Sequence, residues 1–355
     1  MALVGYGLGG SAFHAPLIAA TADLTLGAVV TTDAARAAEV AARYPEAEVV
    51  DRVERLLRAV GDWDLVVVTV PNARHRAVAE AAIEAGLPVV LDKPVTPTVA
   101  EAERLARLAA DRGVSLIPYH NRRWDGDFLT VGDLVSSGRL GQVWRFESRF
   151  ERWKPTPAVG TWKQDPTAPG GGILFDLGPH LVDQALTLFG PPESVYAEIS
   201  ARRAAVVDDA FVALHYTGGP AVHLWASSQA AQLGPRFRVL GSAGGYVKYG
   251  MDPQEDALRA GRSPGGAGWG EEPAGSWGRL GSVEGDRAVP TRPGAYQSFY
   301  AGVAAHLLDG APPPVDFADA VTGLRILEAA VRSARSGVLA PVDTGDRSRP
   351  AGSDG

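Results

Sequence analysis

The sequence of 355 residues contains no cysteine. Disulfide bonds, thiolate nucleophiles and cysteine-ligated zinc or iron–sulfur centres are therefore excluded, so any redox chemistry requires a bound cofactor. Histidine is scarce as well. Its seven residues are scattered without the spacing of metal ligands, so we expect no metal site.

Long apolar runs and basic clusters are also missing. No stretch approaches the roughly 18 apolar residues of a membrane span, and the chain does not open with a basic segment followed by an apolar core. The formal net charge of -7 disfavours nucleic acid as a partner. These absences indicate a cytoplasmic enzyme or binding protein with no membrane partner.

The length suits two domains, each large enough to bury its own core. Over residues 1–119, short apolar runs alternate with longer helical patterns, which predicts βαβ units and a doubly wound parallel sheet. Strands are expected at 2–4, 24–31, 65–70, 88–91 and 114–119, and helices at 11–20, 34–44, 73–85 and 98–112.

After residue 120 the pattern changes. Four runs alternate apolar with polar residues, which is typical of an antiparallel sheet with one wetter face. We therefore expect a second, α+β domain over 120–343, with a large, mostly antiparallel open sheet. Its strands are expected at 143–150, 195–199, 210–216 and 221–225, and its helices at 128–135, 299–308 and 318–335.

Three further expectations concern this second half. The last helix is able to pack back on the first domain. The Gly- and Pro-rich stretch 250–294 is interpreted as a long loop. The polar residues 344–355 are interpreted as a disordered tail.

A cluster of glycines opens the sequence. The stretch GYGLGG has the G-x-G-x-x-G spacing, follows a short apolar run and leads into a helical pattern. In that context the N–H groups of the loop and of the helix start face a pyrophosphate, as in dinucleotide-binding domains. The pattern therefore predicts a dinucleotide site made by Gly5, Tyr6, Gly7, Leu8, Gly9 and Gly10.

The residues at the end of the second strand determine whether such a domain prefers NAD or NADP. Asp33 favours NAD if it is the last strand residue, since an acidic side chain accepts hydrogen bonds from ribose hydroxyls. If Thr32 holds that place, Thr31, Thr32 and Arg36 form a pocket for a 2′-phosphate, and Asp33 caps the next helix. Both alternatives stay open, with a preference for NADP.

Three further polar residues stand out. Lys93 follows the carboxyl end of a predicted strand, and the carboxyl ends of parallel strands are where ligands bind in such a domain. Asp176 and His180 are four residues apart, so on one helix they share a face. Pro179 either kinks that helix or lies in its first turn, which places Asp176 near the cap. Taken singly, each is also explained by a solvated turn or a capped amphipathic helix.

The combination of motifs is more specific. The glycine loop, D-K-P at 92–94 and G-G-G-x-x-x-D-x-G-x-H at 170–180 occur in order, together with TVPN at 69–72 and YHNRRWD at 119–125. The sequence resembles the Gfo/Idh/MocA family of oxidoreductases over nearly its whole length. FHAP at 13–16 and YGMDPQE at 249–255 are closest to the branch that contains NADP-dependent scyllo-inositol dehydrogenases.

This resemblance implies an enzyme that transfers hydride between a nicotinamide cofactor and a secondary alcohol or ketone of a sugar or cyclitol. It assigns the catalytic roles to Lys93, Asp176 and His180. His180 is the general base, Lys93 binds the same oxygen or relays its proton, and Asp176 orients a substrate hydroxyl. It also implies a cis peptide bond before Pro94.

The resemblance extends to the residues around the two ligands. Those expected to contact the cofactor, besides the glycine loop and the second strand end, are Thr69, Val70, Pro71, Asn72, His75, Asp92, Lys93 and Pro94. Those expected to contact the substrate, besides Asp176 and His180, are His14, Asn121, Arg122, Arg123, Trp124, Trp153, Trp162 and Lys163. Asp92 departs from the family pattern, because members usually carry Glu there.

Other functions fit the same motifs. One is a reductase of another small carbonyl or a dihydrodiol dehydrogenase, and another is a silent binding protein that senses a sugar or dinucleotide. The Lys–Asp–His set favours an enzyme, since a sensor does not need it. By analogy we expect a homodimer or homotetramer formed through the second-domain sheet, on a surface with Trp144, Phe146, His215, His223 and Trp225.

Overall fold

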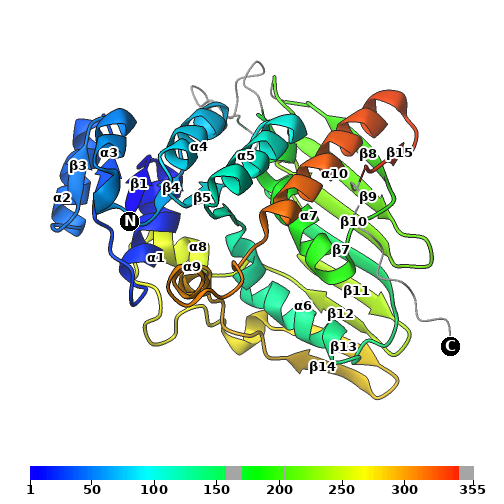
Figure 1. The fold of residues 1–355 in the computed structure, drawn as a ribbon. Coiled ribbons are helices and arrows are strands. Elements are labelled where there is room, and N and C mark those ends of the chain that lie inside the picture. The colour runs from blue at the N-terminus through cyan, green and yellow to red at the C-terminus, as the bar shows by residue number, and fades with distance from the viewer. Residues whose placement is uncertain (155, 157–169, 204, 344–355) are drawn as a thin grey trace.

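The computed structural model describes residues 1–154, 156, 170–203 and 205–343. Two sheets organise them, and helix α10 (Phe317–Ser336) runs between α5 (Val99–Arg112) and the second sheet (Figure 1). This confirms the expected fold class, a Rossmann-type parallel sheet followed by an α+β part with a mostly antiparallel sheet. Within the described residues, no helix is long and apolar enough to cross a membrane.

The first sheet has the strand order β3-β2-β1-β4-β5-β6, and all its neighbours are parallel. Helices cover both faces, which explains why strands such as Val66–Val68 are fully buried valines. The strands are β1 (Ala2–Val4), β2 (Ala28–Val30), β3 (Glu48–Val50), β4 (Val66–Val68), β5 (Val89–Asp92) and β6 (Leu116–Tyr119).

The helices of this part begin and end near their predicted positions. Thr98 caps α5 by accepting the N–H of Glu101, and Gly113 ends that helix with a φ of 63°. The other helices are α1 (Ala15–Ala19), α2 (Ala34–Arg43), α3 (Val53–Arg58) and α4 (His75–Glu84).

Two local predictions for this part need correction, and two short elements were missed. The helix expected at 11–20 begins as a π-helical segment, Gly9–His14, and becomes α1 only afterwards. The strand expected at 24–31 is limited to β2. The edge strand β3 and the short helix α3 were not predicted, because β3 carries only one fully buried residue, Val50, and α3 has six residues.

The second sheet has the order β14-β13-β12-β11-β7-β10-β9-β8-β15. Its neighbours are antiparallel except β7 and β10, which are parallel. Its strands are β7 (Val143–Glu151), β8 (Ser194–Ser200), β9 (Asp209–His215), β10 (Ala221–Ser227), β11 (Phe237–Gly241), β12 (Gly245–Lys248), β13 (Gly278–Ser282), β14 (Gly285–Val289) and β15 (Ala340–Pro341).

The stretch 250–294 is not the long loop predicted from its composition. It holds the helix α8 (Gln254–Arg259) and the hairpin of β13 and β14, which extends the second sheet. Gly285, with a φ of 119°, directly follows the two turn residues of this hairpin and pairs with Ser282 across it, so at this position a glycine serves a tight turn rather than a long loop. The remaining helices are α6 (Gly126–Ser136), α7 (Ile173–Phe189) and α9 (Gln297–Asp309).

Helices α7 and α10 cover one face of the second sheet, and Leu327 of α10 packs in the same core as Leu181 and Phe146. Phe146 therefore faces these helices and is fully buried, which corrects its expected place on an interaction surface. Helix α10 also holds α5, because Arg325 pairs with Glu103 at 2.8 Å. The two halves of the chain thus share a continuous packed contact.

Candidate active site

The glycine loop, residues 5–10, follows β1 and runs into the first residues of the π-helical segment. Gly5 has a φ of 105°, and a Cβ there would lie 2.7 Å from the carbonyl oxygen of Thr69. A Cβ on Gly9 or Gly10 would also collide with neighbouring atoms, whereas a Cβ on Gly7 would meet nothing within 4 Å. The loop is thus packed tightly below and open above Gly7, the side from which a pyrophosphate approaches such a loop. This geometry fits a dinucleotide.

The two non-glycine residues of the loop differ in exposure. Tyr6 is buried, with its hydroxyl 3.4 Å from Glu39, so its side chain belongs to the core beneath the loop. Leu8 is 52% exposed. Tyr6 can therefore contact a cofactor through its backbone but not through its side chain.

The end of β2 shows what Asp33 does in this structure. Its carboxylate accepts the N–H groups of Ala35 and Arg36 at 2.9 and 3.1 Å and so caps α2. The N–H of Arg36 holds the pKa of this carboxyl below its usual range. Thr32 and the guanidinium of Arg36 stand exposed beside it.

The ends of β4 and β5 meet at Asp92. Its Oδ2 accepts the hydroxyl of Thr69 at 3.0 Å, and its Oδ1 accepts the N–H of Lys93 at 2.8 Å. The Lys93–Pro94 peptide bond is cis, as predicted. Thr69 and Asp92 therefore lie together at the carboxyl edge of the sheet, next to the glycine loop.

His75 was expected to contact the cofactor, but the structure gives it a different place. It is 1% exposed, and its two ring nitrogens lie 2.9 and 2.7 Å from the carbonyl oxygens of Pro94 and Val70. Burial lowers its pKa. The ring thus braces the segments that follow β4 and β5. Two other predicted cofactor residues lie in the segment that follows β4. Asn72 is buried there and Pro71 is exposed.

The Nζ of Lys93 reaches across to the first turn of α7. It donates to the carbonyl oxygen of Asp176 at 2.6 Å and lies 3.2 Å from the carboxylate Oδ1 of the same residue. Both side chains are largely buried, at 16% and 25% exposure. This contact thus joins two of the three residues that were assigned catalytic roles, although they are 83 positions apart in sequence.

His180 lies one turn further along α7 and is 5% exposed. Burial lowers its pKa well below the usual range, and the positive charges of Lys93 and Arg122 act in the same direction. Its Nδ1 has no hydrogen-bond partner among the described residues. A neutral imidazole whose buried nitrogen has no partner among the described residues is suited to accept a proton.

Pro179 lies inside α7 rather than in its first turn. Since proline has no N–H, the carbonyl of Phe175 loses the helical hydrogen bond that residue 179 would otherwise donate. Asp176 lies in the first turn of α7. Both Asp176 and His180 therefore stay on one continuous helix, four residues apart.

Several residues that were expected to bind substrate are committed elsewhere. Arg123 makes a bidentate ion pair with the buried Asp183 and also reaches Asp319 at 3.0 Å. Arg122 is buried and donates to Glu255 of α8 at 2.6 Å. These two guanidiniums hold α7, α8 and α10 around the segment that follows β6.

The remaining predicted substrate residues have mixed positions. His14 is fully buried, with Tyr119 and Tyr300 around its ring, so it does not reach the substrate. Asn121 is also buried, and the ring of Trp124 packs on Phe299. Trp153 is 45% exposed, and Trp162 and Lys163 lie outside the described residues.

Two residues near the site were not singled out individually from the sequence. His120 directly follows β6, and its ring lies edge-on to that of His180, with 6.4 Å between centroids. Arg152 follows β7, and its guanidinium lies 4.0 Å from the second carboxylate oxygen of Asp176. The position of His120 at the end of a parallel strand was a usable signal. Arg152 lies in the stretch 149–154, whose basic and aromatic residues offer donors and flat faces to a sugar ring, and that stretch was the corresponding signal.

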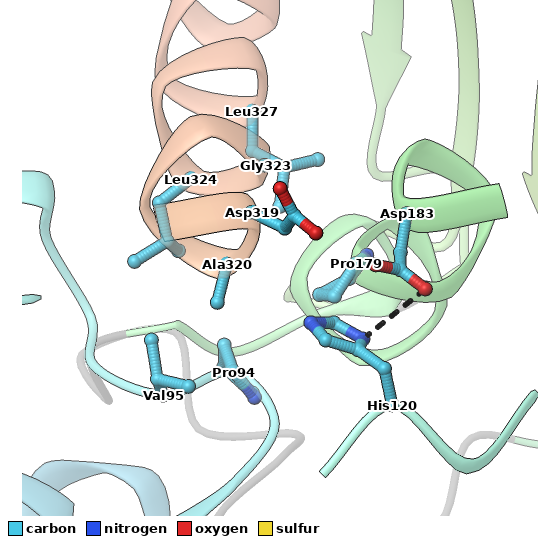
Figure 2. A pocket seen from close by; sticks show the side chains of 10 residues that line it. All are labelled: Pro94, Val95, His120, Pro179, Asp183, Asp319, Ala320, Gly323, Leu324 and Leu327. Atoms are coloured by element: carbon cyan, nitrogen blue, oxygen red, sulfur yellow. Dashed lines mark ion pairs between the residues drawn. The ribbon is translucent and has the colours of Figure 1, made fainter. Parts of the chain in front are cut away.

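Figure 2 shows a small cavity of about 10 Å³ behind the cis-proline segment. His120 and Asp183 stand on one side of it, and Ala320, Gly323 and Leu324 of α10 on the other. The Nδ1 of His120 is 3.9 Å from the carboxylate of Asp183. This cavity has room for one water molecule and is too small for a sugar.

Two family models match the chain. Residues 1–120 match the NAD-binding Rossmann-fold domain of the GFO_IDH_MocA oxidoreductase family, and residues 133–344 match the C-terminal alpha/beta domain of that family. The two matches follow each other in the order of the two sheets.

Individual proteins agree with these matches. The scyllo-inositol 2-dehydrogenase (NADP(+)) IolW of Bacillus subtilis (strain 168) is 37% identical over 339 residues, which cover 94% of this chain and 93% of that protein. The D-glucoside 3-dehydrogenase of Escherichia coli (strain K12) is 30% identical over 192 residues, 54% of either chain. The structure of yvaA from Bacillus subtilis, described as a candidate oxidoreductase, has a TM-score of 0.90 at 36% identity and covers 96% of this chain and 97% of its own.

Proposed function

The chain belongs to the Gfo/Idh/MocA family of NAD(P)-dependent oxidoreductases, and we propose that it interconverts a secondary alcohol and a ketone of a cyclitol or sugar. The observation that carries this proposal is the Lys93–Asp176 pair. It joins the strand edge beside the glycine loop to the helix turn that precedes His180. The inositol-like substrate class rests on similarity to the Bacillus subtilis inositol dehydrogenase.

Lys93, Asp176 and His180 each have a proposed role that their surroundings support. His180 accepts the hydroxyl proton during oxidation, since burial keeps its imidazole neutral. Lys93 hydrogen-bonds the reacting oxygen and stabilises its negative character, while Asp176 fixes the ammonium and orients a neighbouring hydroxyl. A bound nicotinamide supplies the hydride acceptor.

We further propose that the cofactor is NADP rather than NAD. The Oδ1 of Asp33 accepts the two N–H groups that it caps at the start of α2, while its Oδ2 lies 3.8 Å from the guanidinium of Arg36. A carboxylate held in this way is poorly placed to accept ribose hydroxyls. Thr31, Thr32 and Arg36 then offer hydroxyls and a cation to a 2′-phosphate.

The proposed domain roles follow from these positions. Residues 1–119 form the cofactor domain, and residues 120–343 form the domain for substrate binding and assembly. The proposed assembly is a homodimer or homotetramer through the second sheet, and the proposed location is the cytoplasm, where NADP(H) is available.

Two measurements test this function. Titration with NADPH and NADH, followed by cofactor fluorescence, should show tighter binding of NADPH. A screen of polyols that includes myo- and scyllo-inositol should then give reduction of NADP⁺, and His180→Ala should abolish turnover while the affinity for the cofactor persists.

The outcomes separate the alternatives. Turnover only with small carbonyls or dihydrodiols would replace the cyclitol substrate while keeping the chemistry. Binding of the cofactor without turnover on any polyol or carbonyl would favour a sensor and contradict the proposal. Tighter binding of NADH would reverse the cofactor assignment alone.

A further inference from the structure

The carboxylate of Asp92 lies where the ends of β1, β4 and β5 meet. Besides its bonds to Thr69 and to the N–H of Lys93, its Oδ2 lies so close to the glycine loop that a Cβ on Gly9 would come within 3.1 Å. The Asp92 side chain remains 21% exposed. It is therefore fixed in direction and still partly exposed.

A buried histidine stands behind this carboxylate. The Nε2 of His14 lies 3.7 Å from the Oδ2 of Asp92, and its Nδ1 lies 2.6 Å from the hydroxyl of Tyr300. Burial acts to raise the pKa of Asp92, but His14 and Lys93 outweigh it and hold that pKa below its usual range. Asp92 is consequently a carboxylate at neutral pH, and its negative charge is a permanent feature of the site.

The topology places this charge near the reacting half of a dinucleotide. In the order β3-β2-β1-β4-β5-β6, a dinucleotide crosses the sheet edge at the β1 loop. The adenosine then lies over β2, as the proposed function requires for Thr32 and Arg36. The nicotinamide would then be held at the ends of β4 and β5, where Asp92 precedes Lys93.

We propose that Asp92 sets the relative affinity of the site for oxidised and reduced cofactor, and that His14 acts as a positioning residue behind it. This inference rests on the proposed function. The oxidised nicotinamide ring carries a positive charge that the reduced ring lacks, so a nearby carboxylate stabilises the oxidised form preferentially. Because the ammonium of Lys93 is paired with Asp176, it offsets this attraction only in part. The reduced cofactor is bound less tightly and leaves more readily.

Equilibrium binding tests this without any substrate. The Kd of NADP⁺ and of NADPH is measured by calorimetry for the wild type, Asp92→Asn and Asp92→Glu. Asp92→Asn should weaken NADP⁺ relative to NADPH by about tenfold, the order of one charge interaction in a partly solvated site. Asp92→Glu retains the charge and should keep the wild-type ratio.

Asp33→Asn is the matched control. It also removes a carboxylate from the cofactor domain, but at the adenosine end, which is identical in the two redox forms. It should therefore change both Kd values by the same factor. His14→Gln, which acts only through Asp92, should move the ratio less than Asp92→Asn.

The outcomes are distinguishable. An unchanged ratio in Asp92→Asn overturns this inference and leaves the proposed function standing. Wild-type protein that binds neither NADP(H) nor NAD(H) overturns the proposed function instead. If Asp92→Asn does not fold, Asp92→Ser, which keeps an oxygen without the charge, is measured in its place, and a wild-type ratio there is equally fatal to the inference.

Discussion

At the scale of single residues, Lys93 is the side chain that links the two halves of the site. Its ammonium bonds both the backbone and the carboxylate of Asp176, so its position depends on α7 as well as on β5. A lysine is suited to this because its single compact charge and three donors can serve a carboxylate and a substrate oxygen together.

Replacing this ammonium should stop the chemistry and spare cofactor binding. We expect Lys93→Met to lower kcat/KM by about 10²- to 10⁴-fold, the usual contribution of a positioned acid–base group. Lys93→Arg should recover little, since a planar guanidinium does not fit a site built around a point charge. Steady-state kinetics with the polyol identified in the screen measure both, and a loss confined to KM would contradict the assigned role.

The buried histidines make stability depend on pH. Burial lowers the pKa of His75, His120 and His180 in the folded protein, whereas the unfolded chain retains an ordinary value near 6.5. Below about pH 6.5 the unfolded state therefore binds more protons, and stability falls as the pH falls. Asp125 acts in the opposite sense, because burial raises its pKa to about 8.

Because these groups act in opposite senses, the contribution of one histidine is obtained by comparing the pH dependence of unfolding in the wild type and in a variant that lacks that histidine. We expect the free energy of unfolding of His180→Gln to fall less steeply below pH 6.5 than that of the wild type, by up to about 1.4 kcal/mol per pH unit. Urea denaturation at pH 7.0, 6.0 and 5.5 measures this. Parallel pH profiles for the two proteins would show that His180 is not held neutral.

At the scale of elements, Arg123 holds three of them together. It lies in the segment after β6, and its guanidinium pairs with Asp183 of α7 and Asp319 of α10. Asp183 is 4% exposed and Asp319 is 30% exposed at the side chain. The two carboxylates therefore depend on the arginine to very different degrees.

Removing this guanidinium should cost far more than removing the outer carboxylate. We expect Arg123→Met to destabilise the protein by about 3–5 kcal/mol, because it leaves a buried carboxylate without its cation. Asp319→Asn, which retains the buried pair, should cost at most about 1 kcal/mol. Denaturant unfolding compares them, and equal losses would contradict this division of the network.

The same scale shows what the sequence could predict. The α5 boundaries followed from the cap at Thr98 and from Gly113, since both signals are local. Strand β3 and the β13–β14 hairpin carry little apolar periodicity, and their pairing with neighbouring strands stabilises them. The family resemblance placed Lys93 and Asp176 in one site, but their ion pair was not predicted, because no local rule brings together residues 83 positions apart. The ion pairs that occupy Arg122 and Arg123 gave no sequence signal at all.

At the scale of the whole molecule, the two faces of the second sheet differ. Helices α7 and α10 cover one face (Figure 1). The side chains of β9 and β10 that alternate with this core include Phe211, His223 and Trp225, whose rings contact one another at centroid distances of 5.0 to 6.0 Å. Arg149 stacks on Trp225 at 3.8 Å. An aromatic cluster on a face that none of the described helices covers is suited to bury surface against a second copy.

This cluster gives the proposed assembly a direct test. Trp225→Glu places a charge among Phe211, His223 and Arg149, so a sheet-to-sheet interface would carry two such charges, one from each copy, and should dissociate. Sedimentation velocity should show a dimer or tetramer for the wild type and a monomer for this variant. Trp153→Glu is the control, since it also replaces a partly exposed tryptophan but lies outside β9 and β10, and it should leave the assembly intact. A wild-type monomer at all concentrations would refute the assembly, and dissociation by Trp153→Glu alone would move the interface to the end of β7.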